Sequence, residues 1–329
     1  MSGRRGSGLE NELFGITFAN PVLLAAGTCG FGEELSDVVE LDRLGGFVTK
    51  SVTLEPRGGN PAPRVTEFRA GMLNSIGLAN PGARDVLRTK LPWLRDRIRR
   101  ARVIISVAGH SASEYAEVIG ILDPGEGFEG FEVNLSCPND TRLGGLPFAL
   151  DPDAAARVIE AVRPRTQRPL IAKLAPNTPD FGPVIRRLEA AGVDGFTLVN
   201  TMPGLVLDPE SGRPVLGAGP GGVSGPALRA IGVHAVWRAA EYTALPLIGV
   251  GGIAEGEDAE QYLMAGASLV QIGTASFWDP RTAERVLKGV ERAVTRRPGG
   301  LGTLVGLARR SGAAQQPDAP AEAAVENHV

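Results

Sequence analysis

The feature that most constrains the fold is an alternation of short apolar segments with longer amphipathic segments along most of the chain. Several of the apolar segments end in Gly, Asn or Lys. Unbroken apolar runs of strand length are typical of parallel strands that helices cover on both faces. We therefore predict eight strands, at residues 22–26, 46–50, 103–107, 130–135, 169–174, 195–200, 246–250 and 269–272.

A segment with helical features follows each predicted strand. The clearest helices begin at Asp or Pro and end near Gly, and they span residues 151–163, 180–191, 226–242, 255–265 and 280–294. Eight strand–helix pairs predict a closed (β/α)8 TIM barrel of the α/β class, built as a single domain. The alternative is a doubly wound open sheet. It is disfavoured because residues 26–32, after the first strand, lack the G-x-G-x-x-G spacing of a dinucleotide site.

Composition sets the limits of this domain. The chain has 329 residues, of which 43% are hydrophobic and 22% charged, and this is enough for one large core. We expect a flexible N-terminus over residues 1–12 and the barrel over residues 13–298. We expect a disordered tail over residues 299–329, where Gly, Pro, Ala and Glu accumulate.

Charge and cysteine content exclude several classes of function. The net charge of −3 gives no support for nucleic-acid binding. The only two cysteines, Cys29 and Cys137, cannot form a disulfide framework or a zinc cluster, so we expect no metal and a reducing compartment. The N-terminus lacks the apolar core of a signal peptide, and no uncharged apolar run has membrane-spanning length. We therefore expect a cytoplasmic protein that does not bind a membrane.

Polar residues stand at the carboxyl ends of four predicted strands: Lys50, Asn134, Lys173 and Asn200. In a TIM barrel this end of each strand faces the active site. Lys173 lies in an otherwise apolar strand, where burying an ammonium group is costly unless an anion or strong acceptors meet it. Its alternatives are a side chain that reaches out to solvent or an internal salt bridge. Four such residues together favour a site.

Glycines follow the last two predicted strands, as Gly251-Gly252 and Gly273-Thr274. In barrels these two loops frequently bind a phosphate through backbone N–H groups. Gly225, at the start of a predicted helix, can add another close backbone approach. A phosphorylated ligand or cofactor is predicted here. Three long connections, at residues 51–81, 136–150 and 201–225, emerge on the same face and are typical of lids or binding segments.

Cys137 follows the fourth strand in a long, polar, Gly-rich connection. A free cysteine is more often a small buried hydrophobic residue than a catalyst, but this placement on the catalytic face favours function. For Cys29, packing under the first loop is the better interpretation. The histidines form no triad and no metal site.

The segment Asn134-Leu135-Ser136-Cys137-Pro138-Asn139 resembles the class 1 dihydroorotate dehydrogenases. The resemblance extends over about residues 20–289. It includes Thr49-Lys50-Ser51-Val52-Thr53, Gly71-Met72-Leu73-Asn74-Ser75-Ile76-Gly77-Leu78, Lys173-Leu174-Ala175-Pro176-Asn177, Val199-Asn200-Thr201 and Gly221-Gly222-Val223-Ser224-Gly225-Pro226.

This resemblance implies a TIM barrel that binds FMN and oxidises (S)-dihydroorotate to orotate in de novo pyrimidine biosynthesis. It implies FMN contacts at Ala26, Lys50, Ser51, Ser106, Asn134, Lys173, Val199, Gly225, Gly251, Gly252, Gly273 and Thr274. It implies substrate contacts at Lys50, Asn74, Ser75, Ile76, Gly77, Leu78, Asn134, Asn200 and Thr201. The charge of Lys173 would stabilise reduced flavin.

The mechanism implied by the resemblance has Cys137 take a proton from C5 of dihydroorotate while a hydride leaves C6 for the flavin. A free thiol has a pKa of about 8.5, so such a base needs an alkaline medium or local help. Cysteine, where membrane-bound class 2 enzymes use serine, points to class 1.

Within class 1, residues 144–148 and 207–225 look more like the 1B catalytic subunit than the fumarate-using 1A form. This implies a homodimer and a partner subunit that carries FAD and an iron–sulfur cluster and passes electrons to NAD. Two separated cysteines cannot hold such a cluster in this chain.

The sequence departs from the family pattern at three places. Ala26 stands where the family often has Ser, Ser106 stands where an Asn is expected, and residues 140–142 replace an apolar-basic pair. The first two changes shorten or remove a side-chain hydrogen bond. Alternative functions are therefore an FMN enzyme acting on another pyrimidine, a flavin-free barrel that binds a phosphorylated metabolite, and a non-catalytic relative.

Overall fold

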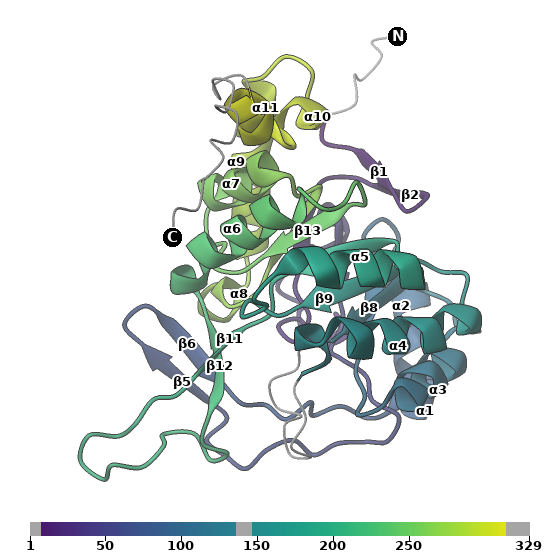
Figure 1. The fold of residues 1–329 in the computed structure, drawn as a ribbon, viewed down its shortest axis with the longest axis vertical. Helices are drawn as coiled ribbons and strands as arrows, with labels where there is room; N and C mark the ends of the chain where they lie inside the picture. The colour runs from purple at the N-terminus through teal and green to yellow at the C-terminus, as the bar shows by residue number, and fades with distance from the viewer. Residues whose placement is uncertain (1–7, 136–146, 314–329) are drawn as a thin grey trace, which may run out of the picture.

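The structure, a computed structural model, describes residues 8–135 and 147–313 of the chain. Its centre is a closed barrel of eight parallel strands (Figure 1), as predicted. Each strand begins and ends within two residues of its predicted bounds. Around the barrel the strands are β3 (Val22–Leu24), β4 (Gly46–Val48), β7 (Arg102–Val107), β8 (Gly130–Asn134), β9 (Leu170–Leu174), β10 (Gly195–Leu198), β13 (Leu247–Val250) and β14 (Leu269–Ile272), and β14 pairs with β3 to close the ring.

Helices cover the outside of this barrel. Several begin where the sequence predicts, because a side chain caps the first turn: Asp151 accepts hydrogen bonds from the backbone of α4, and Asp180 does so for α5. A single 3₁₀ turn, Leu41–Arg43, stands after the first strand in place of an α-helix. The helices are α1 (Ala83–Asp85), a π-helical turn (Val86–Lys90), α2 (Leu91–Arg97), α3 (Ala112–Leu122), α4 (Pro152–Val162), α5 (Phe181–Ala191), α6 (Arg229–Ala239), α7 (Gly256–Ala265), α8 (Ala275–Trp278) and α9 (Thr282–Thr295), with further 3₁₀ turns at Phe148–Leu150, Arg163–Arg165 and Pro226–Leu228.

The interior of the barrel has an apolar lower layer and a polar upper layer. The lower layer contains Leu23, Val48, Ile104, Ile171, Ile248 and Leu269 together with Phe18 of the hairpin formed by β1 (Asn11–Leu13) and β2 (Ile16–Phe18). Because side chains alternate along a strand, the next inward positions lie two residues further toward the carboxyl end. Three of these positions are polar, namely Ser106, Lys173 and Gln271, and the inward residues Glu132 and Thr197 of β8 and β10 add to this layer.

Two of the long connections form a small sheet on the catalytic side of the barrel. β5 (Val65–Phe68) and β6 (Gly71–Asn74) come from the first connection, and β11 (Met202–Gly204) and β12 (Gly221–Ser224) come from the third. They pair antiparallel in the order β11-β12-β6-β5, which extends away from the barrel in Figure 1. This pairing joins segments about 150 residues apart and was not part of our prediction.

The start of the predicted tail is helical. Residues 299–313 contain α10 (Leu301–Leu304) and α11 (Leu307–Ala313), whereas we expected disorder from residue 299 onward. The physical reason is burial: Leu301 and Leu304 are buried, and the Gly306 N–H donates to Leu263 O of α7 at 2.8 Å. Residues 314–329 lie outside the described part. In the described part, no helix combines the length and apolar character needed to cross a membrane.

Candidate active site

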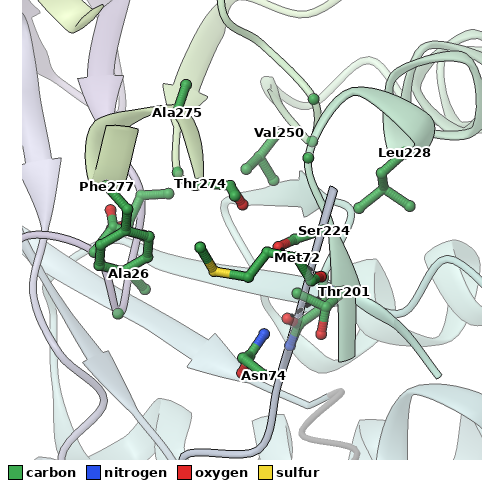
Figure 2. A pocket seen from close by; sticks show the side chains of 18 of the residues that line it. Ala26, Met72, Asn74, Thr201, Ser224, Leu228, Val250, Thr274, Ala275 and Phe277 are labelled. Atoms are coloured by element: carbon green, nitrogen blue, oxygen red, sulfur yellow. Dashed lines mark hydrogen bonds between the residues drawn. The ribbon is translucent and has the colours of Figure 1, made fainter. Parts of the chain in front are cut away.

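A large pocket opens at the carboxyl ends of the barrel strands, between the barrel and the β11-β12-β6-β5 sheet (Figure 2). Most of the residues that we predicted from the sequence line it. They are Ala26, Lys50, Ser51, Asn74, Ile76, Leu78, Asn134, Lys173, Val199, Asn200, Thr201, Gly225, Gly251, Gly252, Gly273 and Thr274. Residues from strands far apart in the sequence therefore converge on one site, as the barrel topology requires.

One end of the pocket is a row of backbone N–H groups. Gly251 and Gly252 have φ values of +126° and +68°, which glycine adopts without the strain that a side chain would bring. A Cβ on Gly252 would lie 2.7 Å from the Arg229 backbone nitrogen. Within residues 8–135 and 147–313, the N–H groups of Gly251, Gly252, Gly273 and Thr274 have no hydrogen-bond acceptor. Adjacent N–H groups in such conformations form an anion-binding concavity.

The floor of the pocket is the polar upper layer of the barrel. Lys173 Nζ lies 3.1 Å from Glu132 Oε1, and both side chains are almost fully buried. Lys173 therefore lines the pocket and also forms the internal salt bridge that we had considered as its alternative. Thr197 Oγ1 and Gln271 Nε2 each donate to Glu132 Oε2 at 2.9 Å.

Glu132, Thr197 and Gln271 were missed in the sequence analysis. Alternation along the strand was the signal that could have found Glu132, because it stands two residues before Asn134 and so faces inward with it. A second group that we missed lies at the mouth: Met72, Val65, Phe277 and Trp278 line the pocket, and the last three are exposed. Met72 reaches into the pocket in Figure 2.

Amide side chains form the wall next to this floor. Asn200 Nδ2 donates to Asn134 Oδ1 at 3.2 Å, and the Thr201 N–H donates to Asn200 Oδ1 at 2.8 Å. Asn134 is held in turn at its backbone, since Tyr115 OH donates to its carbonyl at 2.6 Å. Asn74 enters from the small sheet, with its Nδ2 donating to Gly222 O at 3.1 Å. This wall offers several donors and acceptors to a flat polar ligand.

The segment 74–78 divides its side chains between the pocket and its support. Asn74, Ile76 and Leu78 line the pocket, whereas Ser75 and Gly77 do not. Ser75 is buried and accepts a hydrogen bond from Asn60 Nδ2 at 2.8 Å. Such alternation is what an extended segment produces. The predicted contacts at Ser75 and Gly77 are thus positions whose side chains point away from the pocket.

Ser106 also lies behind the pocket and not in its lining. It is fully buried, and its hydroxyl lies 2.8 Å from that of Ser51, which does line the pocket. The short side chain that replaces the expected Asn thus reaches a neighbouring residue. Ala26 lines the pocket and packs against the apolar barrel layer.

The two cysteines differ in what the structure describes. Cys29 is buried, its Sγ donates to Val48 O at 3.2 Å, and burial raises the pKa of its thiol to about 12. This fits the packing role that we expected for it. Cys137, the predicted base, lies outside the described residues, as do residues 140–142. Among the described residues no cluster of His, Cys, Asp or Glu could hold a metal ion.

A comparison with protein families identifies the chain. Residues 8–294 match the family model described as dihydroorotate dehydrogenase. The chain belongs to the dihydroorotate dehydrogenase family. This family is flavin-dependent in general, and the match spans the whole barrel.

Relatives within the dihydroorotate dehydrogenase family carry two kinds of name. A protein of Citrifermentans bemidjiense, named dihydroorotate dehydrogenase B (NAD(+)), catalytic subunit, is 43% identical over 84% of this chain and 90% of its own length. A protein of Solibacter usitatus, assigned provisionally by name to dihydroorotate dehydrogenase A (fumarate), is 46% identical over 90% of this chain and 98% of its own length.

A solved structure of the same family shares the fold. The crystal structure of DHODH from Eimeria tenella in complex with ferulenol superimposes with a TM-score of 0.78, covering 94% of this chain and 91% of that chain. The two sequences are 24% identical, so this likeness bears on the fold alone.

Proposed function

We propose that this chain oxidises (S)-dihydroorotate to orotate with bound FMN, in de novo pyrimidine biosynthesis. One observation carries the proposal: a single pocket joins a row of N–H groups suited to a phosphate with a floor and wall of lysine and amide side chains. Family membership supports the reaction, because the model matched by residues 8–294 is that of dihydroorotate dehydrogenase.

The residues present fit FMN. A phosphate needs several donors at one place, and the N–H groups of Gly251, Gly252, Gly273 and Thr274 supply them, with Gly225 close by. Ser51, Asn134, Lys173 and Val199 would then contact the ring. Ser106 would act through Ser51, since the two hydroxyls lie 2.8 Å apart. FMN, when bound, accepts the hydride that leaves C6 of dihydroorotate.

The substrate would bind between the amide wall and the segment 74–78. Asn74, Asn134, Asn200 and Thr201 would orient its ring through hydrogen bonds, and Lys50 would meet its carboxylate. Ile76 and Leu78 would exclude water from its edge. The Lys173 ammonium, at the floor, would stabilise the negative charge that develops as the reaction proceeds.

Cys137 would remove the proton from C5 of dihydroorotate through its Sγ. The sequence supports this, because Cys137 stands three residues after Asn134. The other cysteine is a poor candidate, since burial raises the pKa of Cys29 to about 12 and a base must be near its pKa to act at neutral pH.

We further propose that the chain works as a homodimer with a partner subunit that bears FAD and an iron–sulfur cluster and delivers electrons to NAD. The B-type names of relatives such as that of Citrifermentans bemidjiense support this arrangement. The fumarate-type name of the Solibacter usitatus relative makes fumarate the acceptor to test against it.

The test begins with the purified chain. Flavin released by denaturation is identified by mass, and orotate formation from dihydroorotate is then followed with an artificial electron acceptor. The proposal expects FMN and orotate. A colourless preparation favours a flavin-free phosphate-binding barrel. A flavoprotein that turns over uracil or thymine derivatives in preference to dihydroorotate would instead be an enzyme for another pyrimidine. Reduction of NAD or fumarate by the chain alone would contradict the partner subunit.

A further inference from the structure

Glu132 is a buried carboxylate for which the family resemblance gave no role. Its side chain is 1% exposed and points into the barrel from the middle of β8. Burying a carboxylate costs free energy unless charge and hydrogen bonds compensate. Three strands supply this compensation: Lys173 from β9, Thr197 from β10 and Gln271 from β14.

The two oxygens of Glu132 have different partners. Oε2 accepts from the neutral donors Thr197 Oγ1 and Gln271 Nε2, both at 2.9 Å. Oε1 is left for the Lys173 ammonium at 3.1 Å. The orientation of the Gln271 amide follows from this charge, because the opposite orientation would place its oxygen against the carboxylate. As a result Gln271 Oε1 has no partner among the described residues. The neutral donors thus fix the carboxylate independently of the lysine.

Lys173 stands on the other side of this group, where it lines the pocket. An ammonium carries three donor hydrogens, and Glu132 is the acceptor that the described residues offer it. Two N–H bonds therefore remain for a ligand in the pocket. A lysine side chain is flexible, and a fixed carboxylate behind it removes most of that freedom.

We propose that Glu132, held by Thr197 and Gln271, is a positioning residue that fixes the Lys173 ammonium at the floor of the pocket, facing the flavin. The inference rests on the proposed function for the identity of the ligand, but the contact between Glu132 and Lys173 does not depend on it.

The test compares Glu132→Gln with Glu129→Gln. Glu129 stands just before the same strand and pairs with Arg102 at 3.0 Å, so its replacement removes the same charge outside the pocket. The first measurement is the midpoint potential of the bound flavin. If Glu132 positions Lys173, its loss releases the cation and the potential falls. If Glu132 acts only as a nearby negative charge, its loss raises the potential, and a rise or no change overturns the proposal.

The second measurement needs no flavin chemistry. The chain has four lysines, so amine labelling of the protein as purified can be followed by mass spectrometry at each one, with exposed Lys288 as the internal reference. Lys173 is 7% exposed and should label slowly in the wild type. Glu132→Gln should increase its labelling rate several-fold, and Glu129→Gln should not. Equal rates in the two variants overturn the proposal.

Thr197→Val covers the case in which Glu132→Gln does not fold. It removes one donor to Glu132 and keeps every charge, so both readouts should move in the same direction by a smaller amount; no movement in either overturns the proposal. A preparation without flavin counts against the proposed function, whereas labelling still reports on Glu132. Dihydroorotate oxidation by a folded Glu132→Gln protein that matches its control counts against this inference alone.

Discussion

At the scale of the residue, Gly77 is a position where only glycine fits. Its φ is +75°, and a Cβ there would lie 2.5 Å from the Asn60 backbone nitrogen. We predict that Gly77→Ala shifts the segment 74–78, at a cost of about 1–2 kcal/mol, and raises the KM for dihydroorotate about tenfold. Gly58→Ala is the matched control, because a Cβ there meets no heavy atom within 4 Å. Steady-state kinetics that fail to separate the two variants would contradict this assignment.

The two cysteines should differ in reactivity. Burial raises the pKa of Cys29 to about 12, so its reactive thiolate is scarce at neutral pH and increases only as the pH approaches that value. We predict that iodoacetamide leaves Cys29 unmodified in the folded protein near pH 8 and modifies it after unfolding. Peptide mass spectrometry measures both states. Modification of Cys29 in the folded protein would show that its site opens.

The residue scale also shows the reach of sequence analysis. Lys173, Asn134 and Asn200 were identified from their strand ends, and all three line the pocket. The direction of individual side chains in irregular segments was beyond it. Ser75 faces Asn60 and Ser106 faces Ser51, and neither contact follows from local sequence because each partner comes from a distant segment.

At the scale of elements, the barrel strands were predictable and the pairing of the loops was not. A strand buried on both faces is marked by its own apolar run, whereas β6 and β12 are recognisable as strands mainly through each other, with Asn74 opposite Gly222. The helices α10 and α11 were missed for a related reason. Their Gly-rich and Ala-rich composition gives weak local signals, and burial of Leu301 and Leu304 stabilises them.

Removal of α10 and α11 should therefore destabilise the barrel. A chain ending at residue 298 loses the burial of two leucines and the hydrogen bond from Gly306 to Leu263. We predict a loss of about 3 kcal/mol or more in the free energy of unfolding, measured by urea denaturation. A chain ending at residue 313 keeps these contacts and should match the full chain. Equal stability of the shorter chain would contradict a structural role for these helices.

At the scale of the whole molecule, the barrel separates support from chemistry. The apolar lower layer, closed by the β1–β2 hairpin, supports a charged upper layer, and that layer forms the pocket floor. The catalytic side also carries the sheet made from two long connections, which supplies Met72 and Asn74 to the same pocket. Flavin binding, substrate binding and proton removal are thus expected at one end of one domain.

The central claim is that dihydroorotate reduces a flavin held in this pocket. The most direct measurement is anaerobic mixing of the purified chain with dihydroorotate while the flavin absorbance is recorded near neutral pH. We predict that a small excess bleaches the flavin, and that Cys137→Ala slows the bleaching about 100-fold or more. An absorbance that stays unchanged would contradict the oxidation of dihydroorotate, and bleaching of Cys137→Ala at the wild-type rate would contradict the cysteine base.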